Sequence, residues 1–182
     1  MRSLCQIAGG SVMRKYLIYL IVLLSGNGSA LAMANETEAP KCDSRPVKVE
    51  GSSLSPLVAP NSTVEVVPTS CIDEIERDAL VLFRSGAMKK PIIKQVRALG
   101  GDRFELKNGR ILVEEKILDT ATGKPFSLSE ERQAVLRMYV RDYNGIIPEN
   151  TFLLLGTNPA GALDSTRLGL IHRNDIIGVV KP

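Results

Sequence analysis

The sequence predicts a mainly antiparallel β domain with one or two short helices, on three observations. Val, Ile and Leu must supply the core, because aromatic residues make up only 4% of the chain and Trp is absent. The chain also contains 15 Gly and 10 Pro, which supply many turns. Short apolar runs recur between these turn residues, a pattern typical of strands rather than of a helix bundle.

The N-terminal part of the chain has the features of an export signal. Arg14 and Lys15 precede a nine-residue apolar run at residues 16–24, and small residues suited to cleavage follow it. No charged residue occurs over the nineteen residues 16–34, which is about the length needed to cross a bilayer, so an uncleaved anchor is the alternative. We therefore predict that residues 1–34 form a signal peptide or a membrane anchor.

The formal net charge of +3 comes from this leader. Arg2, Arg14 and Lys15 are its charged residues, and without them the remaining chain has a formal net charge of zero. The basic balance therefore indicates targeting, and we expect no nucleic-acid partner. Residues 35–45 are polar and turn-rich, which predicts a linker before a folded domain at residues 46–182.

The folded domain contains eight predicted strands and one predicted helix. Asn108-Gly109 is a strong signal for a hairpin, and Ser129 is a candidate cap for a helix over residues 130–138. We expect residues 108–147 to form an insertion or a lobe of their own. The predicted strands are residues 46–50, 63–67, 79–83, 91–99, 103–107, 110–114, 151–155 and 175–180.

Two of the three cysteines lie in the exported part of the chain. Cys5 belongs to the leader, whereas Cys42 and Cys71 follow it, and an oxidising compartment favours their pairing. A Cys42–Cys71 disulfide would close a loop of about 30 residues, worth roughly 3–4 kcal/mol in the chain-entropy model. Metal binding is a poor alternative, because the one histidine, His172, is distant in sequence. We expect the disulfide, no metal and no cofactor.

The single histidine restricts the mechanisms open to a hydrolase. A Ser-His-Asp triad would have to use His172, which we expect at the surface or at a strand end. Lysine serves as the base where burial lowers its pKa. Lys94 is the candidate, because alternation along a strand places it on one face with Ile92 and Val96. The alternative is a lysine at a strand edge whose amine reaches water.

Ser53 is the candidate nucleophile, within a turn that runs from Gly51 to Pro56. Gly permits a close backbone approach, and Pro stiffens the exit. Such a turn can direct a hydroxyl and a backbone N–H at one point, as an oxyanion site requires. Local reasoning does not exclude Ser52 or Ser55, and an ordinary serine-rich loop is the alternative.

Three motifs occur in order along the chain: residues 51–56 (GSSLSP), residues 94–102 (KQVRALGGD) and a longer one at residues 148–169. The first resembles G-x-S-M-x-P and the second K-R-V-x-G-x-P-G-D of type I signal peptidases, the serine/lysine-dyad S26 peptidases. The third is similar to P-x-x-x-x-F/Y-x-x-G-D-N…S-x-D-S-R-x-x-G of the same family. The matching residues of the third motif are Pro148, Phe152, Gly156, Asn158, Asp164, Ser165 and Gly169.

The resemblance covers about residues 47–180 and implies a serine endopeptidase with a partial β-barrel of the signal peptidase type. Its substrates would be exported preproteins, pilin-like precursors among them, cleaved after small residues. Ser53 would be the nucleophile, Lys94 the general base, and the Ser53 N–H an oxyanion donor. The residues that would complete or support the site are Gly51, Ser52, Asp164 and Arg167.

The resemblance also implies a location. The family usually has an N-terminal membrane segment and acts on the outer side of the membrane, which fits the leader. We therefore expect an inner-membrane protein with a periplasmic catalytic domain, or a periplasmic protein if the leader is cleaved. A membrane surface is an expected contact, and the oligomeric state is left open. The short chain is similar to members that serve conjugative transfer.

Several positions depart from the family pattern. Ala162 stands where a serine normally orients the lysine, which removes a hydrogen bond. The alternative is therefore a catalytically weakened relative that binds peptides as an assembly or chaperone factor. Self-cleaving Ser/Lys repressors are a third class, which the export signal disfavours. The other departures are Leu54 for Met, Gly100 for Pro, Thr157 for Asp and Thr166 for Arg.

Overall fold

The structure is a computed structural model that describes residues 42–86, 88–158 and 162–181. The predicted leader and residues 35–41 of the predicted linker lie outside these residues. Within the described ranges, no helix combines the length and the apolar character that crossing a bilayer requires.

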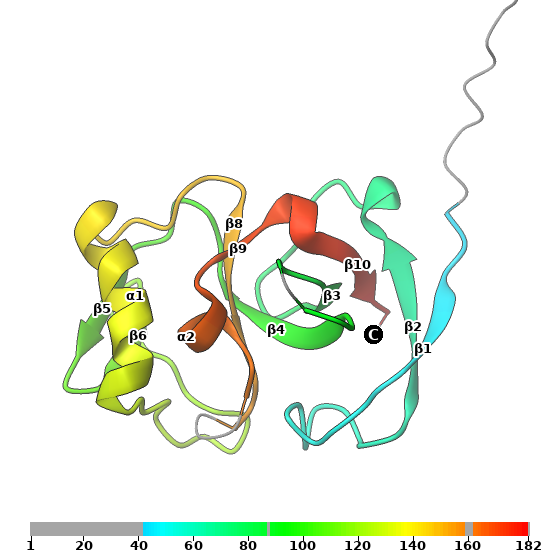
Figure 1. The fold of residues 1–182 in the computed structure, drawn as a ribbon, viewed down its shortest axis with the longest axis horizontal. Helices are drawn as coiled ribbons and strands as arrows, with labels where there is room; N and C mark the ends of the chain where they lie inside the picture. Colours follow the sequence, from blue (N-terminus) through cyan, green and yellow to red (C-terminus); the bar gives the residue numbers. More distant parts are fainter. Residues whose placement is uncertain (1–41, 87, 159–161, 182) are drawn as a thin grey trace, which may run out of the picture. The chain divides into compact units, whose positions relative to one another are not determined.

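A seven-stranded antiparallel sheet forms the larger part of the fold, in the order β1-β2-β10-β3-β4-β8-β9 (Figure 1). Each of its strands except β9 was predicted to within two residues at both ends. β9 was missed because two residues are too few to show alternation. The strands are β1 Arg45–Lys48, β2 Thr63–Pro68, β3 Leu80–Phe83, β4 Ile92–Ala98, β8 Thr151–Leu155, β9 Ile171–His172 and β10 Ile176–Val180.

A three-stranded sheet follows β4 in the chain, with β5 Phe104–Lys107, β6 Arg110–Val113 and β7 Lys116–Ile117. Asn108 and Gly109 join β5 to β6 with φ of 52° and 74°, as the hairpin signal predicts. Glu114 and Glu115 make a second left-handed turn, with φ of 48° and 64°. That turn and β7 were not predicted, because glutamate does not favour positive φ.

The helix α1, Glu130–Asp142, is one turn longer than predicted. Ser129 occupies its N-cap position, but its side chain makes no capping hydrogen bond, so the predicted cap was wrong in that respect. A short helix, α2 Ser165–Leu168, was not predicted, because four residues are too few to show a helical period. Single 3₁₀ turns, η1 Thr69–Cys71 and η2 Arg173–Asp175, precede β3 and β10.

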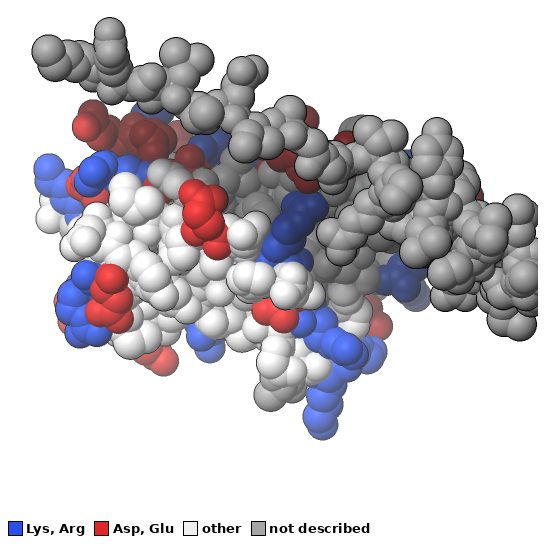
Figure 2. Space-filling view, turned by 90° about the horizontal axis from the view of Figure 1, so that it is seen from above, with Lys and Arg blue, Asp and Glu red and all other residues white. Residues whose placement is uncertain are grey.

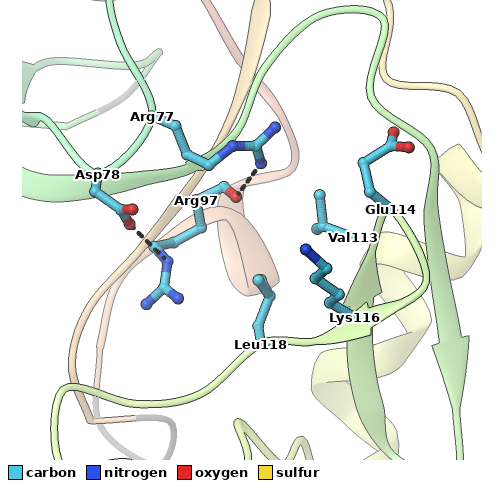
Figure 3. A pocket seen from close by; sticks show the side chains of 7 residues that line it. All are labelled: Arg77, Asp78, Arg97, Val113, Glu114, Lys116 and Leu118. Atoms are coloured by element: carbon cyan, nitrogen blue, oxygen red, sulfur yellow. Dashed lines mark hydrogen bonds and ion pairs between the residues drawn. The ribbon is translucent and has the colours of Figure 1, made fainter.

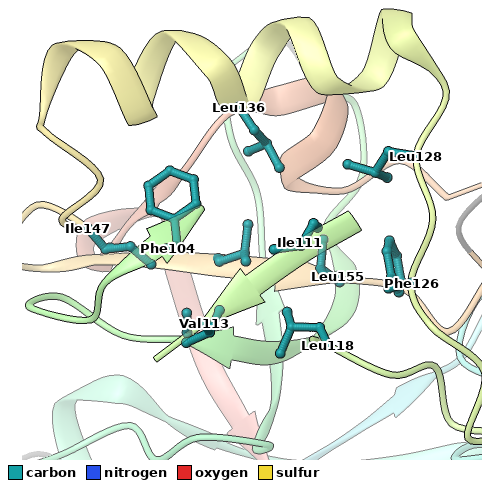
Figure 4. Packing of buried hydrophobic residues seen from close by; sticks show 11 residues of the cluster. Phe104, Ile111, Val113, Leu118, Phe126, Leu128, Leu136, Ile147 and Leu155 are labelled. Carbon is teal, nitrogen blue, oxygen red and sulfur yellow. The ribbon is translucent and has the colours of Figure 1, made fainter. Parts of the chain in front are cut away.

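The small sheet and α1 share a core with the large sheet. Figure 4 shows Leu136 of α1 and Ile111 of β6 pointing into the space between the helix and the small sheet. Leu155 of β8 and Ala98 of β4 belong to the same buried cluster. The small sheet and α1 therefore pack directly on strands of the large sheet, and the expectation that residues 108–147 form an insertion or a lobe of their own stays a prediction.

Two further features complete the fold. A disulfide joins Cys42 and Cys71, with Cα atoms 5.5 Å apart, and so ties the chain before β1 to the turn after β2. On the face shown in Figure 2, Lys and Arg side chains are interspersed with Asp and Glu among the described residues. The fold class is confirmed: the described chain is mainly antiparallel β-sheet with two α-helices.

Candidate active site

Lys94 lies in the interior of the large sheet. It belongs to β4, which pairs with β3 on one side and β8 on the other, and it lies opposite Val81 of β3. Only 3% of the residue is exposed, so its amine does not reach water from a strand edge. Burial lowers the pKa of Lys94 below that of an ordinary lysine, and the negative charge of Asp164 partly offsets this effect.

Ser53 meets this lysine from the turn that follows β1. Lys94 Nζ donates a hydrogen bond to Ser53 Oγ at 2.5 Å, although the two residues are 41 positions apart in sequence. Leu54 is 3% exposed and anchors the turn in a cluster that includes Leu82 of β3. Ser52 is exposed. The structure thus brings the predicted serine and lysine together.

Thr157, which immediately follows Gly156 after β8, forms hydrogen bonds with the backbone of the serine turn. The Ser53 carbonyl accepts from Thr157 N at 2.8 Å and lies 3.0 Å from Thr157 Oγ1. The same hydroxyl donates to the Ser55 carbonyl at 2.6 Å. A Cβ on Gly156 would lie 2.9 Å from Ser53 O, so this close approach requires glycine. In the sequence, Thr157 stood out only as a departure from the Asp of the family motif, and no role was predicted for it.

Asp164 organises the segment on the other side of the site. It is fully buried, and its Oδ2 accepts from Gly156 N at 3.2 Å. Its Oδ1 accepts from Thr166 N at 3.1 Å and from Thr166 Oγ1 at 2.6 Å, which caps α2. The carboxylate therefore fixes both the end of β8 and the start of α2.

Arg132, and not Arg167, is the cation beside Asp164. Arg167 lies in the last turn of α2 with its residue exposed, so the support predicted for it is not what the structure shows. Arg132 comes from α1, is 5% exposed, lies 3.7 Å from Asp164 Oδ1 and donates to the carbonyl of Ala162. Its Nε and Nη1 have no hydrogen-bond partner within the described ranges.

The motifs contained no signal for Arg132. It lies 32 residues before Asp164, on a helix outside all three motifs. One weak sign was available, because Arg132 precedes Leu136 by four residues and so shares the buried face of α1.

A cleft of about 320 Å³ opens at Ser53 and Lys94. Aliphatic side chains from β1, β3 and β4 form much of its lining, among them Val47, Leu82 and Ile93. Such a lining suits an apolar peptide segment. Ser53 and Lys94 therefore lie at a cleft with largely apolar walls.

A second cavity, of about 300 Å³, lies elsewhere and is lined by neither Ser53 nor Lys94 (Figure 3). Its arginines are already engaged: Arg97 Nε lies 3.4 Å from Asp78, and Arg77 Nη1 donates to the Arg97 carbonyl. No nucleophile paired with a base is found among its described lining residues, so it does not compete as a catalytic site.

The remaining predicted residues lie as follows. Gly51 is exposed with φ of 81°, a conformation that favours glycine, and it begins the serine turn. His172 is exposed at the end of β9, and its Nδ1 accepts from Asn174 N at 3.1 Å. Within the part of the chain that the structure describes, no group of three His, Cys, Asp or Glu could hold a metal ion.

The chain is similar in sequence to known signal peptidases. Signal peptidase I of Streptococcus pneumoniae is 26% identical over 164 residues, which cover 74% of this chain and 79% of that protein. Signal peptidase I U of Bacillus subtilis is 24% identical over 139 residues, covering 74% and 72%. A solved signal peptidase I from Enterococcus faecalis aligns with a TM-score of 0.41 and 17% identity, over 60% of this chain and 99% of that one.

The family model described as signal peptidase, peptidase S26, matches residues 39–182, a span that includes all three motifs, the serine turn and both sheets. A match over that much of the sequence identifies the chain as a member of the signal peptidase family S26.

Proposed function

We propose that this chain is a signal peptidase I-like serine endopeptidase that removes N-terminal signal sequences from exported preproteins. The observation on which the proposal rests is the 2.5 Å contact between the Ser53 hydroxyl and a buried lysine amine. Among the described residues, the one histidine is exposed on β9, so a mechanism based on Lys94 accounts best for the site.

In the first step, Lys94 acts as the general base. Its lowered pKa makes the neutral amine available at a lower pH than for an ordinary lysine. The amine takes the proton of Ser53 Oγ as this oxygen attacks the scissile carbonyl carbon. The ammonium then returns the proton to the leaving amine, which leaves an ester between Ser53 and the signal peptide.

Two further roles complete the cycle. The backbone N–H of Ser53, with Gly51 and Ser52 beside it, donates to the oxyanion of each tetrahedral intermediate. Water attacks the ester carbon while Lys94 accepts its proton, and the ammonium returns this proton to Ser53 Oγ as the ester bond breaks, which releases the signal peptide. Asp164 supports these steps indirectly, because it holds Gly156, which packs against the Ser53 carbonyl.

The substrates proposed are preproteins with small residues before the cleavage site, and pilin-like precursors are included among them. The aliphatic lining of the cleft beside Ser53 supports an apolar segment of signal peptide as the occupant. We place the catalytic domain on the outer side of the inner membrane, tethered by residues 1–34 or released after their cleavage. The apolar run at residues 16–24 supports export in both cases.

The test is cleavage of a preprotein with an Ala-x-Ala site by the wild-type chain and by Ser53→Ala and Lys94→Ala. We expect each substitution to reduce kcat/KM by at least about 10³-fold, because each removes a group that acts directly on the reacting atoms. Ser55→Ala is the matched control, since Ser55 is an exposed serine of the same turn, and it should cleave normally.

Equal activity in all of these proteins would overturn the assignment of Ser53 and Lys94. A wild-type chain that binds the preprotein without cleaving it would contradict the enzyme proposal and would favour a peptide-binding relative. A panel of exported precursors, with pilin-like ones included, identifies the preferred substrates.

A further inference from the structure

The segment just after β8 holds the serine turn through one hydroxyl. Thr157 Oγ1 lies 2.6 Å from the Ser55 carbonyl and 3.0 Å from the Ser53 carbonyl. Thr157 N donates separately to Ser53 O at 2.8 Å. Because a hydroxyl has one proton, the backbone amide serves Ser53 O and the hydroxyl mainly serves Ser55 O. Thr157 therefore binds the backbone of the turn at Ser53 and at Ser55, on both sides of Leu54.

The other contacts of the turn hold different points. The apolar side chain of Leu54 anchors the turn in the core. Because hydrophobic burial is not directional, this contact does not fix the orientation of the backbone of the turn. Ser55 N donates to Ser52 O within the turn, and Val58 N, two residues after the turn, donates to Leu54 O, so both bonds are local. Within the described residues, Thr157 thus supplies the hydrogen bonds that tie the backbone of residues 53–55 to another segment.

The contacts of Thr157 lie where they can affect the position of Ser53 Oγ. The hydroxyl must stay aligned with Lys94 Nζ, which is 2.5 Å away on a rigid strand. A displacement of about 1 Å at a reacting atom costs on the order of 100-fold in rate. Both carbonyls that Thr157 contacts belong to the turn that carries Ser53, so the contact bears on the position of Ser53.

We propose that Thr157 is a positioning residue for the peptidase reaction, and that its hydroxyl proton holds the serine turn in register with Lys94. This inference rests on the proposed roles of Ser53 and Lys94. In this chain the contacts of Thr157 suit a hydroxyl and not the carboxylate of the Asp in the family motif. An ionised carboxylate has no proton to donate, and it would face two carbonyl oxygens with like partial charge.

The experiment compares three substitutions of the same residue in the full chain, with the Ala-x-Ala preprotein as substrate. Thr157→Val keeps the shape and removes the proton, and we expect kcat to fall about 10- to 100-fold with KM within about twofold. Thr157→Ser keeps the hydroxyl and should retain kcat within about threefold. Thr157→Asp restores the family residue and should be at least as slow as Thr157→Val.

Thr151→Val is the matched control. Thr151 begins the same strand, β8, and its hydroxyl donates to the Pro148 carbonyl at 2.7 Å, far along the strand from the turn. The control also loses one hydrogen bond from a threonine hydroxyl to a backbone carbonyl, but it should leave kcat unchanged. A kcat for Thr157→Val that equals that of Thr151→Val would overturn the inference while leaving the Ser53 and Lys94 roles intact. Activity that survives Ser53→Ala would instead overturn the proposed function.

Hydrogen exchange gives a second measurement that does not depend on activity. The amides of Ser55 and Val58 both donate to carbonyls of the turn. In Thr157→Val we expect them to exchange about tenfold faster than in Thr157→Ser, while the amides of β4 exchange at the wild-type rate. Equal exchange in the two variants would show that the hydroxyl does not hold the turn.

Discussion

The strand that holds Lys94 and the turn that holds Ser53 are fixed in different ways. β4 pairs with neighbours along both edges, and its Val96 and Ala98 are fully buried. In the serine turn, Leu54 is buried while Gly51 and Ser52 are exposed. Lys94 is thus placed by the sheet, whereas Ser53 is placed by a few contacts from distant parts of the chain.

Because of this difference, β4 with Lys94 and the turn with Ser53 should respond differently to substitution. A change at the lysine should alter chemistry and leave the fold intact, because the sheet does not depend on the amine. A change at an anchor of the turn should alter stability and the alignment of the serine together. Four predictions test this contrast, from the largest expected effect to the smallest.

Lys94→Met should abolish cleavage and also stabilise the protein. We expect kcat/KM to fall by at least about 10³-fold because the base is lost. The free energy of unfolding at pH 7 should rise by on the order of 1 kcal/mol, because a buried amine is replaced by an apolar group of similar size. Cleavage assays and denaturant titrations measure the two effects. Lys107→Met, at an exposed residue, is the control, and a less stable Lys94→Met would contradict the prediction.

Arg132→Met should destabilise the segment on which the serine turn depends. The substitution leaves Asp164 buried without its cation, and breaking such a pair costs about 3 kcal/mol or more. Arg167→Met removes an exposed arginine and should change the free energy of unfolding by less than about 0.5 kcal/mol. Equal losses in the two variants, measured by denaturant unfolding, would show that Arg132 is not the cation that Asp164 needs.

Leu54→Ala should destabilise the serine turn directly. Leu54 is 3% exposed, so truncation should cost about 2–3 kcal/mol in the free energy of unfolding. Leu57 follows the turn directly but is 45% exposed, and Leu57→Ala should cost less than about 0.5 kcal/mol. Thermal or denaturant unfolding of both variants gives the comparison. A similar cost at the two leucines would mean that the turn is not anchored through Leu54.

The pH dependence of cleavage should follow Lys94. Its neutral form is the base, so kcat/KM should rise with pH through the lowered pKa and reach its plateau below the pH expected for an ordinary lysine. Asp164→Asn removes the negative charge that raises this pKa, so the rise should move to lower pH. Asp142→Asn, on the surface, is the control. A rise that stays in place in Asp164→Asn would contradict the assignment.

The same shift has a consequence for stability. Between the lowered pKa of folded Lys94 and its unfolded value of 10.5, the unfolded chain binds the extra proton. The contribution of Lys94 to the free energy of unfolding therefore rises with pH through this window. It does not change below the folded pKa, where both states are protonated.

Much of the fold could be predicted from local pattern. The strand at residues 151–155 was predicted with its observed bounds, and the apolar run at residues 79–83 became the buried strand β3. The turn at Asn108-Gly109 formed as expected, because that pair adopts positive φ readily. Elements of two to four residues, such as β9 and α2, escaped because they are too short to show a period.

The site was predictable only in part. The order of the motifs singled out Ser53 and Lys94 before any geometry was known, since the first motif contains Ser53 and the second contains Lys94. The support around them was not predictable in the same way. Arg167 was chosen because it is adjacent to the motif in sequence, but the arginine beside Asp164 comes from α1.

The sequence by itself determined the antiparallel strands, the two residues proposed for catalysis and the membership of the chain in its family. Only the tertiary structure decided how the serine turn is held, because Ser55 and Thr157 are 102 residues apart and meet through packing. It also decided that Arg132 lies beside Asp164. Local propensity depends on neighbouring residues in the chain, whereas these contacts depend on how the sheet brings distant segments together.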